Sequence, residues 1–288
     1  MIDEARSAER MPRWLLRPVR CGPSLQRVAD VLSEERLNTV CDGAKCPNRG
    51  ECYSAGTATF MIMGDRCTRD CGFCAVPAGG AGPLDADEPR RVAKAAATMG
   101  LKHVVVTSVT RDDLPDGGAG HFAATVEAVR DELPGATVEV LVPDFGGSEK
   151  DVDTVIDARP DVFNHNLETV KRLYCEVRPQ ADYARSLEVL GQAAGAGLPT
   201  KSGFMVGLGE DGQEVRELLE DLCRAGCTLM TAGQYLRPSA SNLPVSRYWE
   251  PGEFASLEAE ALSLGFEAVT SGPLVRSSYF AHEMLDKR

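Results

Sequence analysis

Three cysteines with short spacings offer the clearest chemistry in this chain of 288 residues. Cys67, Cys71 and Cys74, here called the first triad, form the pattern CxxxCxxC within GDRCTRDCGFC. Thiolates this close in sequence can meet around one inorganic iron–sulfur core. Three ligands leave one iron of a cubane cluster open, so a small molecule can chelate that iron and receive an electron from it. A structural zinc site is the alternative, but such sites usually close with four protein ligands, and the next histidines downstream are His103 and His121.

A second group of three cysteines precedes the first. Cys41, Cys46 and Cys52, here called the second triad, form CxxxxCxxxxxC in VCDGAKCPNRGEC, a spacing that matches no common zinc pattern. A second cluster needs a fourth ligand from elsewhere in the fold, or it keeps an open iron. The alternatives are one larger site that uses all six cysteines, or two zinc sites. We assign no function to the remaining four cysteines, which are Cys21, Cys175, Cys223 and Cys227.

Short apolar runs that alternate with helical stretches must position these groups. The strands are expected at 57–64, 102–109, 137–143, 161–166, 200–207 and 228–236, and the helices between them at 88–100, 121–133, 149–157, 182–197 and 212–226. This alternation predicts a parallel sheet with right-handed crossovers. Six units favour an α/β fold of the partial (β/α)6 TIM-like barrel type, with a doubly wound sheet as the alternative. In barrels the chemistry gathers in loops that follow the strands, and the first triad lies in such a loop.

Composition and charge limit the function further. No apolar run reaches the about 18 residues that a membrane span needs, and the N-terminus lacks the apolar core of a secretory signal, so we expect a cytoplasmic protein without a membrane partner. The net charge of −12 argues against nonspecific nucleic-acid binding. We expect three parts, which are an N-terminal extension with the second triad (1–56), the barrel (57–240) and a C-terminal extension (241–288).

Several motifs resemble those of one enzyme family. CxxxCxFC, with Phe73 before the third cysteine, is the signature of the radical S-adenosylmethionine superfamily. Together with CxxxxCxxxxxC and the C-terminal RSSY (276–279), it makes the chain resemble the lipoyl synthases. Further segments match in the family's order and cover nearly the whole chain, among them GTATFMIMG, TSVTRDDLPDGGA, NHNLET, VRPQADY, KSGFMVGLGE and GQYLRPS. RSSY is followed by Phe280, where we expect a polar or basic residue, but this position is not a proposed ligand.

The resemblance implies a distinct role for each triad. The first triad would hold a 4Fe-4S cluster whose open iron binds the amino and carboxylate groups of S-adenosylmethionine. The second triad would hold an auxiliary 4Fe-4S cluster with a serine of RSSY as its fourth ligand, and we favour Ser278 over Ser277. Serine oxygen is an unusual and labile iron ligand, which suits a cluster that is taken apart during the reaction.

Four residues are candidates for binding S-adenosylmethionine, and they are Phe73, Asn164, Glu168 and Arg178. Asn164 and Glu168 in NHNLET follow the fourth expected strand, where polar groups can hydrogen-bond the ribose hydroxyls. Arg178 can pair with the methionyl carboxylate. For each of them, loop capping or a buried salt bridge is the alternative.

The resemblance also implies the reaction. The family's substrate is an octanoyl chain amide-linked to a lysine of a lipoyl carrier domain, and the product carries sulfur from the auxiliary cluster at carbons 6 and 8. An unactivated methylene offers no acidic proton and no leaving group, so only a hydrogen-abstracting species from a cofactor can begin the reaction. Cleavage of S-adenosylmethionine to methionine and a 5′-deoxyadenosyl radical would supply it, twice per product.

The implied partners follow from this reaction. They are octanoylated carrier domains of 2-oxoacid dehydrogenase subunits and the glycine cleavage H protein, an electron donor such as flavodoxin or ferredoxin, and an iron–sulfur carrier that rebuilds the spent cluster. Two other functions compete with this one. A dual-cluster methylthiotransferase would need a basic RNA-binding module and no RSSY, and a zinc-stabilised interaction protein would be colourless.

Overall fold

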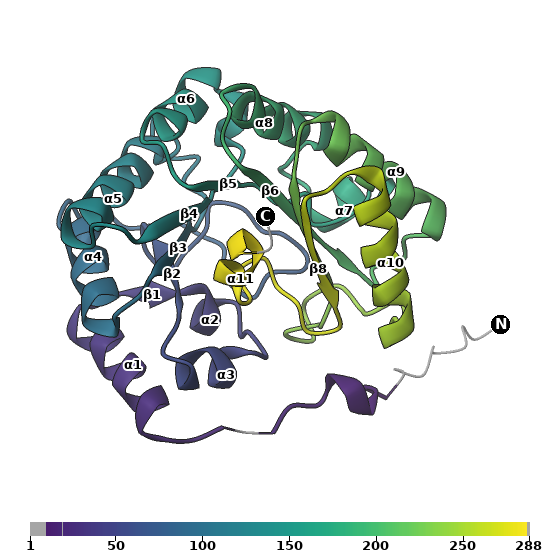
Figure 1. Cartoon of the computed structure of the whole chain (residues 1–288), viewed down its shortest axis with the longest axis horizontal. Coiled ribbons are helices and arrows are strands. Elements are labelled where there is room, and N and C mark those ends of the chain that lie inside the picture. Colours follow the sequence, from purple (N-terminus) through teal and green to yellow (C-terminus); the bar gives the residue numbers. More distant parts are fainter. Residues whose placement is uncertain (1–9, 19, 287–288) are drawn as a thin grey trace.

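A parallel sheet curves around the centre of the molecule, with helices along its outer side (Figure 1). The computed structural model describes residues 10–18 and 20–286, so the first nine residues of the expected N-terminal extension lie outside the described residues. Within the described part, the sheet has eight strands that are paired in chain order. Strands β2 to β8 run parallel, whereas β1 is antiparallel to β2. Since β1 and β8 form the two edges, the barrel is open.

The strands are β1 (Asn38–Thr39), β2 (Thr59–Ile62), β3 (His103–Ser108), β4 (Thr137–Leu141), β5 (Val162–Asn164), β6 (Thr200–Val206), β7 (Leu229–Gln234) and β8 (Ala268–Gly272). The helices are α1 (Pro23–Glu34), α2 (Val40–Gly43), α3 (Arg49–Ser54), α4 (Glu88–Met99), α5 (Ala119–Glu132), α6 (Glu149–Asp157), α7 (Tyr174–Val177), α8 (Tyr183–Gly195), α9 (Gly212–Arg224), α10 (Pro251–Leu264) and α11 (Ala281–Asp286).

The predicted α/β barrel is confirmed, with one difference at its edges. Strands β2 to β7 are the six expected strands, and α4, α5, α6, α8 and α9 are the expected helices between them. The sheet continues past this core, because β1 joins it before β2, and α10 with β8 adds a further unit after β7. The sequence of β8 is AVTSG, whose polar half hides it from a search for apolar runs. Pairing with β7 is what makes this segment a strand.

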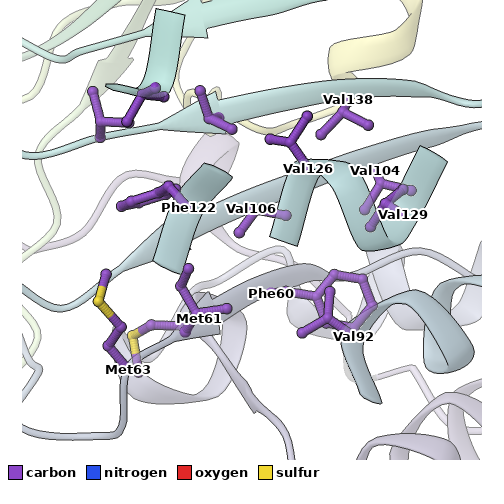
Figure 2. Packing of buried hydrophobic residues seen from close by; sticks show 14 of the residues in the cluster. Phe60, Met61, Met63, Val92, Val104, Val106, Phe122, Val126, Val129 and Val138 are labelled. Atoms are coloured by element: carbon purple, nitrogen blue, oxygen red, sulfur yellow. The ribbon is translucent and has the colours of Figure 1, made fainter. Parts of the chain in front are cut away.

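The outer face of the sheet packs against α4 and α5 in a continuous apolar layer. Figure 2 shows Phe60, Val104, Val106 and Val138 from the strands beside Val92, Phe122, Val126 and Val129 from the helices. All eight side chains are fully buried. Burial of each such side chain stabilises the fold by about 1.5–3 kcal/mol, so this layer is a large part of what holds the barrel together.

The inner face of the sheet carries several buried polar residues. Thr59, Glu139, Asn164, Lys201 and Thr231 are all 5% exposed or less. The strands look continuously apolar in sequence because one or two polar residues stand among many apolar ones. Inside the barrel, these few residues come together.

The C-terminal helix covers the end of the barrel at which the strands begin. Met284 of α11 is buried in a cluster with Val162, Leu229 and Ala268, which lie at the starts of β5, β7 and β8. In Figure 1, α11 lies inside the ring of strands, and it also contacts β3. The chain therefore enters the barrel interior between β8 and α11. None of the helices in the described part of the chain is long and apolar enough to cross a membrane.

Candidate functional site

The first triad lies on the loop that follows β2. The sulfur of Cys67 accepts hydrogen bonds from the backbone N–H groups of Arg69 at 3.4 Å and Thr110 at 3.3 Å, and the sulfur of Cys74 accepts one from Val76 at 3.4 Å. Burial is the largest cause that raises the pKa of the Cys74 thiol to about 12; the charges of the other two triad sulfurs add to the rise, and the hydrogen bond from Val76 opposes it. Coordination by a metal deprotonates such a thiol. The N–H groups are then in place to stabilise the thiolates.

Arg69, between the first two cysteines of this triad, fixes the loop to two of its neighbours. Its guanidinium forms two bonds of 2.8 Å with Asp112, which follows β3, and one of 2.6 Å with Asp144, which follows β4. The Arg69 and Asp144 side chains are 5% and 0% exposed, and Asp144 also pairs with Arg185 at 3.2 Å. Sequence reasoning missed Arg69, because an arginine in a polar loop is ordinarily solvated.

Replacement of Arg69 by methionine is expected to loosen the first triad. The change removes the main partner of a buried carboxylate, so unfolding free energy should fall by about 3 kcal/mol. The iron retained after anaerobic purification should fall with it. Arg90→Met is the matched control, since Arg90 is 67% exposed and pairs with Asp87 on the surface. Thermal denaturation and iron analysis check both variants, and equal melting temperatures for the two would contradict the expectation.

The second triad lies on α2, on α3 and on the turn between them. Tyr53, fully buried, joins the two helices, since its hydroxyl donates to Asp42 Oδ2 at 2.6 Å and lies 2.9 Å from Oγ1 of Thr39, the N-cap of α2. Burial raises the pKa of Cys41 to about 11 and that of Cys52 to about 12. The charges of the other two triad sulfurs add to the rise in the pKa of Cys52. All three cysteines line the same cavity.

The C-terminal segment 274–279 reaches the second triad from the far end of the chain. Asn48 Nδ2 donates to the carbonyl of Leu274 at 2.6 Å, across 226 residues of sequence. The Tyr279 hydroxyl donates to Glu51 Oε2 at 3.1 Å. RSSY therefore lies directly beside CPNRGEC. Sequence reasoning also missed Asn48, although its position between two triad cysteines is a usable signal.

One cavity of about 390 Å³ connects the two triads. Its lining contains the whole second triad, Cys74 of the first triad, and both serines of RSSY. Its other polar lining residues include Asn166, Glu168 and Arg276, and its apolar ones include Phe73, Phe204, Met205 and Leu236. A largely apolar cavity with a few convergent polar groups is the usual form of a small-molecule site.

Two of the four predicted cofactor-binding residues line this cavity, and two do not. Phe73 and Glu168 belong to the lining. Asn164 is fully buried within the barrel, where its Nδ2 donates to Glu139 Oε1 at 3.0 Å. Two residues further on, Asn166 lines the cavity instead and donates to Glu168 Oε1 at 3.0 Å.

Arg178 lies behind the cavity lining, close to the first triad. Its Nη1 donates to the carbonyl of Asn166 and to the hydroxyl of Tyr174, both at 2.8 Å, while its Nε has no partner among the described residues. Burial raises the pKa of Cys71, and the charge of Arg178 partly opposes that rise. A buried donor without a partner, beside a cysteine of the first triad, is suited to a carboxylate ligand.

The two serines of RSSY differ in their surroundings. Ser277 Oγ donates to Asn166 Oδ1 at 2.8 Å, and the Ser277 carbonyl accepts a bond from Lys201 Nζ at 2.6 Å. Ser278 lines the cavity, and its hydroxyl forms no hydrogen bond with any residue that the structure describes. The Ser277 hydroxyl is thus already bonded to Asn166, whereas that of Ser278 has no partner among the described residues.

These residues fit two cubane clusters and S-adenosylmethionine better than they fit zinc. Among the described residues, no group of three His, Cys, Asp or Glu side chains is arranged to hold a single metal ion. A cubane does not need such an arrangement, since each thiolate binds a different iron. Each triad offers three sulfurs, the second has a free serine oxygen beside it, and the first has an unpartnered arginine nitrogen.

Comparison with known proteins gives the same assignment. The family model described as the radical SAM superfamily matches residues 61–222. The lipoyl synthases of Rubrobacter xylanophilus and Caldanaerobacter subterraneus subsp. tengcongensis are 55% and 56% identical to this chain, over 96% and 94% of it and over 86% and 96% of their own lengths. The crystal structure of methylornithine synthase has a similar fold, with a TM-score of 0.56 and 15% identity over 85% of this chain and 81% of that one. With its second triad, Cys74 of the first triad and RSSY lining one cavity, the chain therefore belongs to the lipoyl synthase family of the radical SAM superfamily.

Proposed function

We propose that this chain carries out the sulfur insertion of lipoyl synthases with a separate role for each triad. The first triad holds the 4Fe-4S cluster that binds S-adenosylmethionine, and the second triad and Ser278 hold the 4Fe-4S cluster that is the sulfur source. The free hydroxyl of Ser278, in the same cavity as three cysteines without a fourth ligand, carries this proposal. When bound, the clusters and S-adenosylmethionine supply the electron, the hydrogen-abstracting radical and the sulfur for carbons 6 and 8 of an octanoyl chain.

The residues around the first triad bind and orient S-adenosylmethionine. Arg178, through its unpartnered Nε, pairs with the methionyl carboxylate. Glu168 and Asn166 take the ribose hydroxyls, and Asn166 here replaces Asn164, because Asn166 lines the cavity and Asn164 does not. Burial raises the pKa of Glu168, and the charge of Arg178 opposes this rise. Phe73 contributes an apolar wall.

The apolar part of the cavity receives the alkyl chain and excludes water. Phe204, Met205 and Leu236 line it, and they offer no polar group to compete for the substrate. Water exclusion protects a reactive species from side reactions. In this arrangement the barrel (57–240) positions the radical cofactor, while the N-terminal (1–56) and C-terminal (241–288) extensions together form the sulfur-donor site.

The partners follow from the substrate class. Lipoyl synthases act on lipoyl carrier domains, and for this chain we propose the octanoylated carriers of 2-oxoacid dehydrogenase subunits and the glycine cleavage H protein. Flavodoxin or ferredoxin serves as the electron donor, and an iron–sulfur carrier rebuilds the second cluster in the cytoplasm. Neither a nucleic acid nor a membrane takes part.

Mass measurement of an octanoylated carrier peptide tests this function. After anaerobic incubation with S-adenosylmethionine and a reductant, each acyl chain should have gained two sulfur atoms. The purified protein should be brown and contain about eight irons per chain, four for each cubane. Cys175→Ser is the matched control, because Cys175 is exposed and belongs to neither triad. A colourless protein, or a brown one that leaves the peptide unchanged, would exclude the proposal.

A further inference from the structure

A buried ion pair inside the barrel is bonded to the C-terminal segment. Lys201 of β6 is 0% exposed, and its Nζ lies 2.9 Å from Oε1 and 3.2 Å from Oε2 of Glu139 on β4. The third bond of the ammonium goes to the carbonyl of Ser277, at 2.6 Å. An ammonium has three N–H donors. The ion pair is therefore fully bonded only while the C-terminal segment is in place.

The strands on either side hold the carboxylate of this pair. Asn164 of β5 donates to Glu139 Oε1 at 3.0 Å, and Nε2 of His103 on β3 lies 3.5 Å from Glu139 Oε2. Burial alone would raise the pKa of Glu139, but the charge of Lys201, with help from His103, lowers it to about 2. The carboxylate is therefore ionised, and it keeps the ammonium directed at the C-terminal segment.

The barrel wall also leaves room for this segment. At Gly203 of β6, a Cβ would lie 2.6 Å from Oγ1 of Thr231 on β7, 2.7 Å from Ser277 Oγ and 2.9 Å from Asn166 Oδ1. At Gly233 of β7, a Cβ would collide with the carbonyl oxygen of Val275. The glycine at 233 therefore leaves room for the backbone of the C-terminal segment, and the glycine at 203 leaves room for the side chains of Ser277, Asn166 and Thr231.

We propose that Lys201 and Glu139 are positioning residues that lock the C-terminal segment into the barrel and thereby hold Ser278 at the second triad. This inference rests on the proposed role of Ser278 as a ligand. A buried ion pair is commonly no more stabilising than an apolar pair of the same size, so stability alone does not account for it. The bonds to the carbonyl and to the hydroxyl of Ser277 fix the orientation of the following residue, Ser278, and they leave the Ser278 hydroxyl without a partner among the described residues.

The proposed lock, which is the bonding of the C-terminal segment to Lys201 and Glu139, is tested by hydrogen exchange of residues 274–281. The double variant Lys201→Met/Glu139→Gln, which removes both charges, is compared with the unaltered chain. Exchange is measured on anaerobically purified protein and again after chelation has removed the iron. After chelation, the segment should exchange about tenfold faster or more than in the unaltered chain, while peptides from β3 to β6 keep their protection. The purified variant should hold less iron and still form 5′-deoxyadenosine from S-adenosylmethionine.

Two control variants separate the lock from other effects. Thr125→Val removes a buried hydroxyl on α5 whose one partner among the described residues is the His121 carbonyl, and it should leave exchange of residues 274–281 unchanged. Ser278→Ala should lose iron but keep slow exchange after chelation, because the ion pair remains. Iron content thus tests the assignment of Ser278 as a ligand, whereas exchange after chelation tests the lock, so failure of one can be distinguished from failure of the other.

The outcome that overturns the lock is equal exchange of residues 274–281 in the double variant and the unaltered chain. Should the double variant not fold, the two single variants decide instead. Glu139→Gln keeps the ammonium bonded to Ser277, whereas Lys201→Met removes that bond and leaves the carboxylate beside His103. The lock requires that the lysine variant release the segment and that the glutamate variant release it less, so equal exchange in both contradicts it.

Discussion

Ser278→Ala is expected to separate two activities of this chain: the variant should still cleave S-adenosylmethionine, but it should insert no sulfur into the octanoyl peptide. The Ser278 hydroxyl forms no hydrogen bond with the residues around the first triad or with any other described residue, so its removal leaves the bonds of those residues intact. The second cluster, in contrast, loses the fourth ligand that we propose for it. Changes to residues that merely support a metal ligand cost about 10–100-fold in affinity or activity, so loss of the ligand itself should lower product formation by at least about a hundredfold.

Ser277→Ala is the matched control for this experiment. It removes one hydrogen bond, from Oγ to Asn166, and leaves the carbonyl bonded to Lys201. Loss of such a bond costs about 1 kcal/mol, so product formation should largely persist. Mass spectrometry of 5′-deoxyadenosine and of the peptide measures both activities. If cleavage and product formation fell in parallel in Ser278→Ala, or if Ser277→Ala were the inactive variant, the assignment of Ser278 would be wrong.

The barrel core was predictable because its signals are local. Each strand from β2 to β7 is a short apolar run, and each following helix has its own boundary residues. At β8 this signal fails, since AVTSG becomes a strand through its pairing with β7 rather than through its own pattern. Whether a segment at the edge of the sheet becomes a strand depends on its pairing with residues that are distant in sequence, and the local pattern of apolar residues does not reveal that pairing.

The grouping of six cysteines into two triads is likewise a prediction from local spacing, whereas the residues that surround the triads could not be predicted from spacing. Spacing alone groups the cysteines, but the bond from Asn48 to the carbonyl of Leu274 joins residues 226 positions apart. Asn164 and Asn166 both come at the end of β5, and only the structure distinguishes the one in the barrel interior from the one at the cavity. The sequence of a strand does not reveal which of its polar residues lies inside the barrel and which one lines the cavity.

The buried ion pair lies between these two cases. A charged residue within a short strand is a visible anomaly, and both Glu139 in TVEVL and Lys201 in TKSGFMV are of this kind. Their pairing requires strand order, because β4 and β6 are separated by β5 in the sheet. The bond of Lys201 to the Ser277 carbonyl requires in addition that the C-terminal segment pass through the barrel. The sequence thus shows that two charged residues stand within strands, but their partners can be identified only from the fold.

Replacement of all three cysteines of the first triad by alanine is expected to stop cleavage of S-adenosylmethionine itself. Without these thiolates no iron is left open for the amino and carboxylate groups, so neither 5′-deoxyadenosine nor sulfur-containing peptide should form. Iron should fall from about eight to about four per chain, since the second cluster has its own ligands on other elements. The sulfurs of the two triads lie on different segments, the loop after β2 and helices α2 and α3, so removal of one set need not unfold the other.

The matched comparison is the same replacement in the second triad. That variant should also retain about four irons per chain, but it should still form 5′-deoxyadenosine while leaving the octanoyl peptide unchanged. The two triple variants should therefore contain the same amount of iron, but only the variant of the second triad should form 5′-deoxyadenosine. This difference assigns a separate role to each cluster. If 5′-deoxyadenosine still formed without the first triad and disappeared without the second, the two roles would be reversed, and Ser278 would then belong to the cluster that binds S-adenosylmethionine.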